Sequence, residues 1–160
     1  LLLRAGQRPE AALDQLNKFM LEKTSGKFAT MFLFAVDQLG KGNYISAGHN
    51  AAYMYRAAQN EVEELDSNCM ILGALDFATF ETTPFEMHTG DLLVVYSDGL
   101  TEEGNPAEEM FGEERLKKIV FKEASAGPAQ LQKAMLAAVE GFTRGHTQSD
   151  DITIVIMQRA

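Results

Sequence analysis

Apolar residues near the start of the chain recur at the spacing of an α-helix. Leu13, Leu16 and Met20 follow one another at intervals of three and four, which places them on one helix face. Pro9 suits a first helical turn because its φ is fixed near the helical value. The Thr-Ser-Gly that comes after the last apolar position favours a turn. The pattern therefore predicts an amphipathic helix over residues 9–23.

From Phe28 to His88 the pattern changes to short apolar runs that are separated by turn-forming residues. Aromatic and β-branched side chains are frequent in these runs, as is typical of strands. Because the links are short, neighbouring strands are expected to pair antiparallel, since parallel neighbours need long crossovers. The segments expected to be extended are 29–36, 43–47, 52–57, 61–65 and 77–88.

The second half of the chain combines two apolar strands with two helical patterns. The segment 92–96, Leu-Leu-Val-Val-Tyr, predicts a strand most strongly. Apolar residues at helical spacing then predict helices over 113–122 and 128–142. The apolar segment 152–157 predicts a final buried strand.

The composition is that of one acidic globular domain. The chain has 160 residues, a size that fits one compact domain, and 46% of them are hydrophobic. With 14 Lys and Arg against 23 Asp and Glu, the formal charge is −9, which argues against binding nucleic acid or an anionic membrane surface. No apolar run approaches the roughly 18 residues of a membrane span, and no signal-peptide pattern is present. A single cysteine, Cys69, has no partner for an internal disulfide, so we expect a reducing compartment, the cytoplasm.

Acidic residues lie at the ends of the two most apolar strand segments. Asp98 follows the segment 92–96, and Asp150 and Asp151 precede the segment 152–157. If these strands are antiparallel neighbours, the carboxylates converge at one edge of a sheet. Close carboxylates repel unless a cation or a proton intervenes, and hard oxygen ligands favour Mg²⁺ or Mn²⁺. The alternative is that these aspartates are ordinary turn and capping residues.

Asp91 is excluded from this group by distance. It precedes the same strand that Asp98 follows, and at ~3.3 Å per residue the two lie about 20 Å apart. We therefore expect Asp91 to be a hairpin turn residue.

Five segments together carry a family resemblance. The segment 90–102, Gly-Asp-Leu-Leu-Val-Val-Tyr-Ser-Asp-Gly-Leu-Thr-Glu, resembles a hallmark of the metal-dependent protein phosphatase 2C superfamily, and most of all its bacterial SpoIIE-type branch. The similarity runs from about Pro9 to the C-terminus. It implies an α+β fold, a four-layer helix–sheet–sheet–helix sandwich with antiparallel sheets. The other segments, in the family's order, are Ser46-Ala47-Gly48-His49-Asn50, Leu72-Gly73, Phe111-Gly112-Glu113-Glu114-Arg115-Leu116 and Asp150-Asp151-Ile152-Thr153.

The resemblance also implies a catalytic site and its cofactor. Asp98 and Asp150 match the family's metal-binding aspartates, and Asp151 occupies the following, more variable place. Enzymes of this family hold two Mn²⁺ or Mg²⁺ ions, which activate a water that attacks phosphoserine or phosphothreonine of a protein. The usual substrates are phosphorylated anti-sigma-factor antagonists, and sensory or receiver domains often lie upstream. The resemblance thus implies a protein serine/threonine phosphatase domain of a bacterial signalling regulator.

The sequence departs from the family pattern in two places. The family's earlier Gly-Asp motif, which supplies an aspartate that bridges the metals, does not occur, and the only Gly-Asp here is Gly90-Asp91. The second departure is Ala51-Ala52, where the family often has proline. The N-terminal Leu1-Leu2-Leu3 also resembles the middle of an element. We therefore expect residues 1–160 to be the C-terminal portion of a single SpoIIE-type phosphatase domain without its N-terminal strands.

The missing motif has consequences for activity and assembly. Without the bridging carboxylate, Asp98 and Asp150 would hold at most one weakly bound ion, so this chain alone is expected to be weak or inactive. Missing strands would expose a sheet edge that favours a homodimer. The alternative function is a non-catalytic, pseudophosphatase domain that binds a protein partner.

The histidines show no metal-ligand spacing relative to one another. His49 lies in the Gly-His-Asn segment and is expected to stabilise a turn rather than to act in catalysis. His146 is expected to be a solvated loop residue, although it precedes Asp150 closely enough to approach a phosphate. No role is expected for His88.

Two acidic pairs and the cysteine complete the candidates. Glu102-Glu103 and Glu108-Glu109 are expected to form a solvated acidic face or to cap nearby helices. Cys69 lacks a basic neighbour that would lower its pKa, so it is expected to be a buried, inert thiol.

Overall fold

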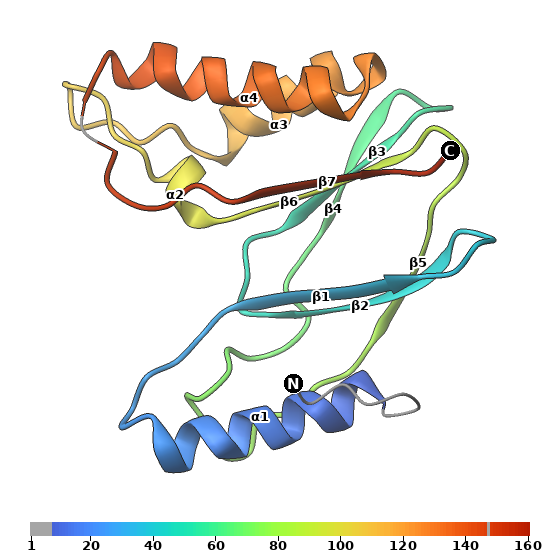
Figure 1. Ribbon diagram of the computed structural model, residues 1–160, viewed down its shortest axis with the longest axis vertical. Coiled ribbons are helices and arrows are strands. Elements are labelled where there is room, and N and C mark those ends of the chain that lie inside the picture. Colours follow the sequence, from blue (N-terminus) through green and yellow to red (C-terminus); the bar gives the residue numbers. More distant parts are fainter. Residues whose placement is uncertain (1–7, 147) are drawn as a thin grey trace. The chain divides into compact units, whose positions relative to one another are not determined.

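The computed structural model describes residues 8–146 and 148–160, which form two compact units (Figure 1). The first unit takes the described residues up to His49 together with Asp66–Glu86. The second takes Asn50–Leu65 and the described residues from Met87 onward. The expectation for Leu1–Leu3 lies outside the described residues, and the assignment of 1–160 to one domain stays a prediction.

The first unit is a three-stranded antiparallel sheet backed by one helix. Its strand order is β1-β2-β5. Leu13 of the helix packs with Ile45, Leu72 and Phe80 in a buried cluster. The elements are α1 (Pro9–Lys23), β1 (Met31–Val36), β2 (Lys41–Ala47) and β5 (Thr83–Glu86).

A buried amide side chain ties α1 to a loop segment that precedes β5. Asn17 is 2% exposed, and its Oδ1 accepts a hydrogen bond of 2.7 Å from the backbone N–H of Gly73. Its Nδ2 donates to the carbonyl of Leu75 at 2.9 Å. Because a buried amide must find partners, these bonds fix the helix against the 73–75 segment.

The second unit is a four-stranded antiparallel sheet covered by helices. Its strand order is β4-β3-β6-β7, and every neighbouring pair is antiparallel. The strands are β3 (Ala52–Arg56), β4 (Glu61–Leu65), β6 (Leu92–Tyr96) and β7 (Ile154–Gln158). The helices are α2 (Asp98–Thr101), α3 (Glu113–Glu123), the 3₁₀ turn η1 (Ala124–Ala126) and α4 (Pro128–Thr143).

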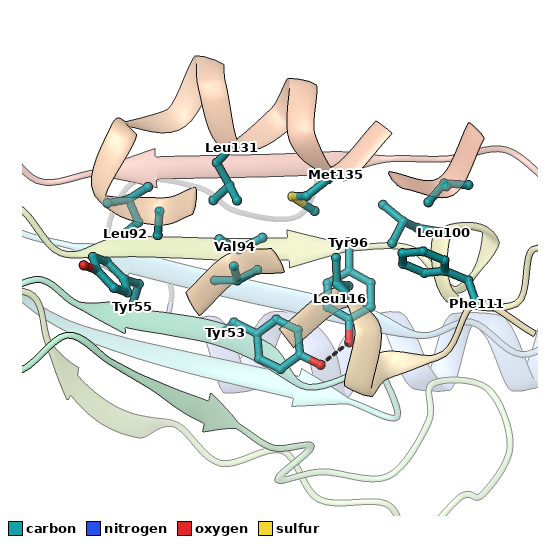
Figure 2. Close-up of a cluster of buried hydrophobic side chains, with 13 residues drawn as sticks. Tyr53, Tyr55, Leu92, Val94, Tyr96, Leu100, Phe111, Leu116, Leu131 and Met135 are labelled. Carbon is teal, nitrogen blue, oxygen red and sulfur yellow. Dashed lines mark hydrogen bonds between the residues drawn. The ribbon is translucent and has the colours of Figure 1, made fainter. Parts of the chain in front are cut away.

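Alternate residues of the central strands form the core of the second unit (Figure 2). Tyr53 and Tyr55 on β3 and Val94 on β6 point to the same face, as the period of two in a strand requires. Leu116 of α3 and Leu131 of α4 cover this face, and both are fully buried. The helices are thus held by apolar burial on one face of the sheet.

These elements confirm the predicted α+β class: in the described residues, one antiparallel sheet is backed by a single helix and the other is covered by several. The predicted segment 61–65 matches β4, 92–96 matches β6, and the helical ranges agree within one residue. The prediction of extended structure over 77–88 is wrong for most of its length, because only Thr83–Glu86 forms a strand. Phe80 in the irregular part instead fills the core of the first unit. None of the described helices is long and apolar enough to cross a membrane.

Candidate metal site

The ends of β6 and β7 meet at one edge of the second sheet. The two strands pair antiparallel with Tyr96 opposite Ile154, which confirms the predicted pairing. Beyond the ladder, the backbone N–H of Ser97 donates to the carbonyl of Thr153 at 3.0 Å. The antiparallel pairing therefore brings the residue after Ser97, Asp98, to the edge from which β7 starts.

The backbone of Gly99 lies against the backbone of Asp151. A Cβ atom built at position 99 would stand 2.5 Å from the carbonyl oxygen of Asp151 and 3.4 Å from the carbonyl carbon of Asp150. Real Cβ atoms do not approach backbone oxygen so closely, so only glycine fits here without movement. The glycine that follows Asp98 is thus explained by close packing against the backbone of Asp150 and Asp151.

Ser97 fixes the same loop through its hydroxyl. Its Oγ donates to the carbonyl of Asp151 at 3.1 Å and accepts from the backbone N–H of Thr153 at 2.9 Å. These bonds join the start of α2 to the segment that precedes β7.

The three candidate carboxylates are exposed. Oδ1 of Asp98 accepts from the N–H of Gly99 at 3.0 Å, and Oδ1 of Asp150 accepts from the N–H of Asp151 at 2.7 Å. A carboxylate has two oxygens, so these local bonds are compatible with binding a cation through Oδ2. The role of Asp98, Asp150 and Asp151 as ligands stays a prediction.

The donor chemistry of this edge fits a hard divalent cation. Mg²⁺ keeps several waters and takes only one or two carboxylates from a protein, and both Mg²⁺ and Mn²⁺ prefer oxygen ligands. Within residues 8–146 and 148–160, no group of three or more His, Cys, Asp or Glu side chains is placed to hold a metal together. A divalent cation at this edge would therefore take only one or two carboxylates from this chain, with water as its other ligands.

Glu103 does not lie on a solvated face, and the prediction for it is wrong. It is 2% exposed, and its Oε1 accepts from the backbone N–H of Ser149 at 2.9 Å and from its hydroxyl at 3.2 Å. Glu102, Glu108 and Glu109 are exposed, as predicted. The sequence carries no signal that separates Glu103 from Glu102, because the partner of Glu103 lies 46 residues away.

Asp91 closes a turn with His88, but this turn joins β5 of the first sheet to β6 of the second, so the predicted hairpin is wrong. Asp91 also holds a buried ion pair. It is 1% exposed; its carboxylate accepts from Arg56 Nη1 at 3.0 Å and from the N–H groups of Ala57 and His88, each at 2.9 Å. Burial by itself raises the pKa of Asp91, but the two N–H groups and the Arg56 guanidinium outweigh it and hold the pKa below its usual value. This carboxylate is therefore occupied in the fold and is not available to a metal.

The structure gives each histidine neighbours of its own. His49 lies in the first unit, where its Nδ1 is 3.3 Å from the hydroxyl of Thr30. The exposed His88 has its Nδ1 3.6 Å from Asp91. His146 is exposed at the end of α4, as predicted, and its backbone N–H donates to the carbonyl of Thr143.

Cys69 is half-buried, so the prediction of a buried thiol is wrong. Its Sγ accepts from the N–H of Glu81 at 3.3 Å and lies 3.6 Å from the carbonyl of the same residue. The thiol thus links two loop segments of the first unit.

The family-like segment 111–116 serves the fold of the second unit. Phe111 is buried in the core of the second unit, and Gly112 precedes α3 with a φ of +81°, which favours glycine. Arg115 Nη1 donates to the carbonyl of Phe111 at 2.7 Å, and its guanidinium lies 4.8 Å from the ring centre of Phe142. The segment 111–116 therefore secures the start of α3.

Two antiparallel sheets with helices packed against them are the fold of the PP2C-type phosphatase class. A solved structure of this class, the SiaA PP2C domain of Pseudomonas aeruginosa, matches with a TM-score of 0.80 and 20% identity, over 96% of this chain and 60% of that one. At this identity the match shows the fold alone. The chain belongs to the SpoIIE family, described as stage II sporulation protein E, whose model matches residues 1–160.

Two curated relatives agree with this assignment. Protein IcfG of Synechocystis sp. is 30% identical over 134 residues, which are 82% of this chain and 21% of that protein. Phosphoserine phosphatase RsbU of Bacillus subtilis is 26% identical over 165 residues, which are 99% of this chain and 47% of that protein. The chain thus spans less than half the length of each of these relatives.

Proposed function

We propose that this chain is part of a Mn²⁺- or Mg²⁺-dependent protein serine/threonine phosphatase domain in a bacterial signalling regulator. The observation that carries the proposal is the contact between the Asp98-Gly99 and Asp150-Asp151 pairs at one sheet edge. Membership of the SpoIIE family and the likeness to RsbU, a phosphoserine phosphatase, support the same activity.

Asp98 and Asp150 would hold the cation, with Asp151 as a third candidate. A bound Mn²⁺ or Mg²⁺ lowers the pKa of water and neutralises charge on phosphoryl oxygens. Ser97 and Gly99 contribute by fixing the backbones that carry these carboxylates, through the hydroxyl bonds to 151 and 153 and through close packing. The exposed position of the three aspartates leaves them open to a phosphoprotein.

The proposed substrate is phosphoserine or phosphothreonine on a protein such as an anti-sigma-factor antagonist. The complete protein would work in the cytoplasm and carry a sensory or receiver domain upstream. Two ions are proposed for the complete domain, and a weaker site for this chain by itself. A homodimer is a further part of the proposal.

A non-catalytic partner-binding domain is the second candidate. The only Gly-Asp in residues 1–160 is Gly90-Asp91, and the Asp91 carboxylate is engaged by Arg56. That aspartate therefore cannot supply the bridging ligand that the family's earlier motif provides. If the complete protein also lacks such a motif, the binding function is favoured.

A phosphatase assay tests the proposal. Release of phosphate from a phosphoserine peptide is measured with and without Mn²⁺, for this chain and for the complete protein that contains it. We expect Mn²⁺-dependent release by the complete protein, weak or no release by this chain, and loss of release in Asp98→Asn and Asp150→Asn. Asp76→Asn, at an exposed loop aspartate of the first unit, is the matched control. Near-normal phosphate release by either site variant would overturn the assignment of the site. If the complete protein releases no phosphate, the non-catalytic partner-binding function is favoured.

A further inference from the structure

We infer that Glu103 is a positioning residue, whose buried carboxylate holds Ser149 and so fixes the loop that carries Asp150 relative to Asp98. The inference rests on the proposed function for the roles of Asp98 and Asp150. Glu103 is not one of the proposed metal ligands. It acts on the ligand Asp150 through its hydrogen-bonded partner, Ser149.

The contact between Glu103 and Ser149 is specific. One oxygen, Oε1, accepts both the backbone N–H of Ser149 at 2.9 Å and its hydroxyl at 3.2 Å. Glu103 is 2% exposed, although Ser149 itself is exposed. Burying a carboxylate is costly unless hydrogen bonds compensate, and bonds to a charged acceptor are about twice as strong as neutral ones. The loop is therefore held by a strong bond at the residue directly before Asp150.

Glu103 is itself held by the core of the second unit. Its carbonyl accepts from the backbone N–H of Phe111 at 2.8 Å, and the carbonyl of Thr101 accepts from that of Gly112 at 2.8 Å. Phe111 is 2% exposed within the core cluster. The side chain of Glu103 thus starts from backbone that is held by hydrogen bonds at Thr101 and at Glu103 itself.

Two residues, Ser97 and Glu103, anchor the loop that carries Asp150 to the segment that carries Asp98. Ser97 lies before Asp98 and bonds the carbonyl of Asp151. Glu103 lies after Asp98 and bonds Ser149, before Asp150. A metal site needs its ligands held within about 0.5 Å of the productive geometry, and residues around the ligands supply that precision. Removing one anchor frees one side of the Asp150 loop.

The test combines two measurements on this chain by NMR. Hydrogen exchange of the Ser149 amide reports the bond to Glu103. Broadening of the backbone amide signals of Asp98 and Asp150 by added Mn²⁺ reports metal binding. Glu103→Ala removes the acceptor, and Glu103→Asp keeps the charge but shortens the side chain by one methylene. Glu103→Gln keeps an acceptor oxygen in place, and Glu102→Ala changes an exposed neighbour as the matched control.

We expect Glu103→Ala and Glu103→Asp to speed exchange of the Ser149 amide at least tenfold and to require about ten- to hundredfold more Mn²⁺ for equal broadening. Glu102→Ala should stay within about threefold of wild type in both measurements. Glu103→Gln keeps the acceptor without its charge and should fall between wild type and Glu103→Ala. If Glu103→Ala does not fold, Glu103→Asp against Glu102→Ala gives the same comparison.

Unchanged exchange at Ser149 in Glu103→Asp would overturn the inference. Faster exchange with unchanged Mn²⁺ broadening would also overturn it, because Glu103 would then serve the fold only. If wild type shows no broadening at either aspartate, the proposed metal site fails. The exchange result then still decides whether Glu103 holds the loop.

Discussion

Gly99 and Asp151 touch through their backbones, and a Cβ atom at position 99 would stand 2.5 Å from the Asp151 carbonyl oxygen. The glycine after Asp98 is therefore required by the loop that carries the other two candidate carboxylates. Close backbone approach of this kind is one of the reasons for glycine in a fold. The two acidic segments are thus coupled by packing as well as by the hydrogen bonds of Ser97.

Replacement of Gly99 by alanine tests this contact. We expect Gly99→Ala to lower the free energy of unfolding by about 1–3 kcal/mol, because backbone must move to admit the Cβ atom. The measurement is urea unfolding followed by circular dichroism. The control is Gly141→Ala in α4, where an added Cβ meets nothing within 4 Å, and which we expect to stabilise by about 0.5–1 kcal/mol. Equal stability of Gly99→Ala and wild type would show that the loop can move away.

The buried Asp91 carboxylate predicts a large loss of stability on neutralisation. We expect Asp91→Asn to lower the free energy of unfolding by about 3 kcal/mol, because it leaves the guanidinium of Arg56 without its buried partner. Glu63→Gln is the control, since Glu63 pairs with the same Arg56 but is half exposed. We expect that change to cost less than about 1 kcal/mol. A small effect of Asp91→Asn would contradict the assignment of the pair as structural.

The same carboxylate predicts how stability depends on pH. The pKa of Asp91 is lowered in the fold, against about 3.9 in an unfolded chain. Its contribution is therefore present above about pH 4 and is lost as the pH falls through the lowered pKa. Arg56 and His88 are the charged or titratable side chains that face it. Urea unfolding between pH 5 and pH 2 should show a shallower loss of stability in Asp91→Asn than in wild type, and parallel curves would contradict this.

The stacked tyrosines of the core predict an asymmetry between two similar variants (Figure 2). Tyr96 donates to the hydroxyl of Tyr53 at 3.4 Å, and Tyr53 donates to the carbonyl of Glu113 at 3.3 Å. Burial raises the pKa of both phenols, so they remain neutral donors. Tyr96→Phe removes one bond and should cost about 1 kcal/mol, whereas Tyr53→Phe also leaves a buried hydroxyl without its acceptor and should cost about 1–3 kcal/mol. Thermal unfolding of the two variants should rank them in this order, and the reverse order would contradict the direction of the bonds.

Most elements of the fold could be predicted from the sequence because their patterns are local. The apolar run at 92–96 and the helical spacing at 128–142 needed no tertiary information. The prediction of a strand over 77–82 is wrong because the aromatic residues of this segment are also typical of strands. Phe80 is instead buried in the core of the first unit, in a segment that pairs with none of the described strands.

The candidate site could be predicted in part. Asp98 and Asp150 are candidates because of their places at strand ends, and the pairing of β6 with β7 confirms the geometry on which that prediction depends. Their role as ligands stays a prediction. The buried hydrogen bonds of Glu103 and Asp91 could not be predicted, because their partners, Ser149 and Arg56, lie 46 and 35 residues away. A buried carboxylate and an exposed one look alike until the chain is folded.

The central claim is that Asp98 and Asp150 share one of the two cations proposed for the complete domain. A Mn²⁺ titration by calorimetry tests it on the complete protein and on its Asp98→Asn, Asp150→Asn and doubly substituted variants. Each single change should weaken Mn²⁺ binding at least tenfold. The double variant should bind Mn²⁺ only slightly more weakly than the single variant with the lower affinity, because the effects of two residues that bind the same ion are not independent. Asp76→Asn should bind as wild type does. Additive losses, or unchanged affinity in either single variant, would contradict a shared site.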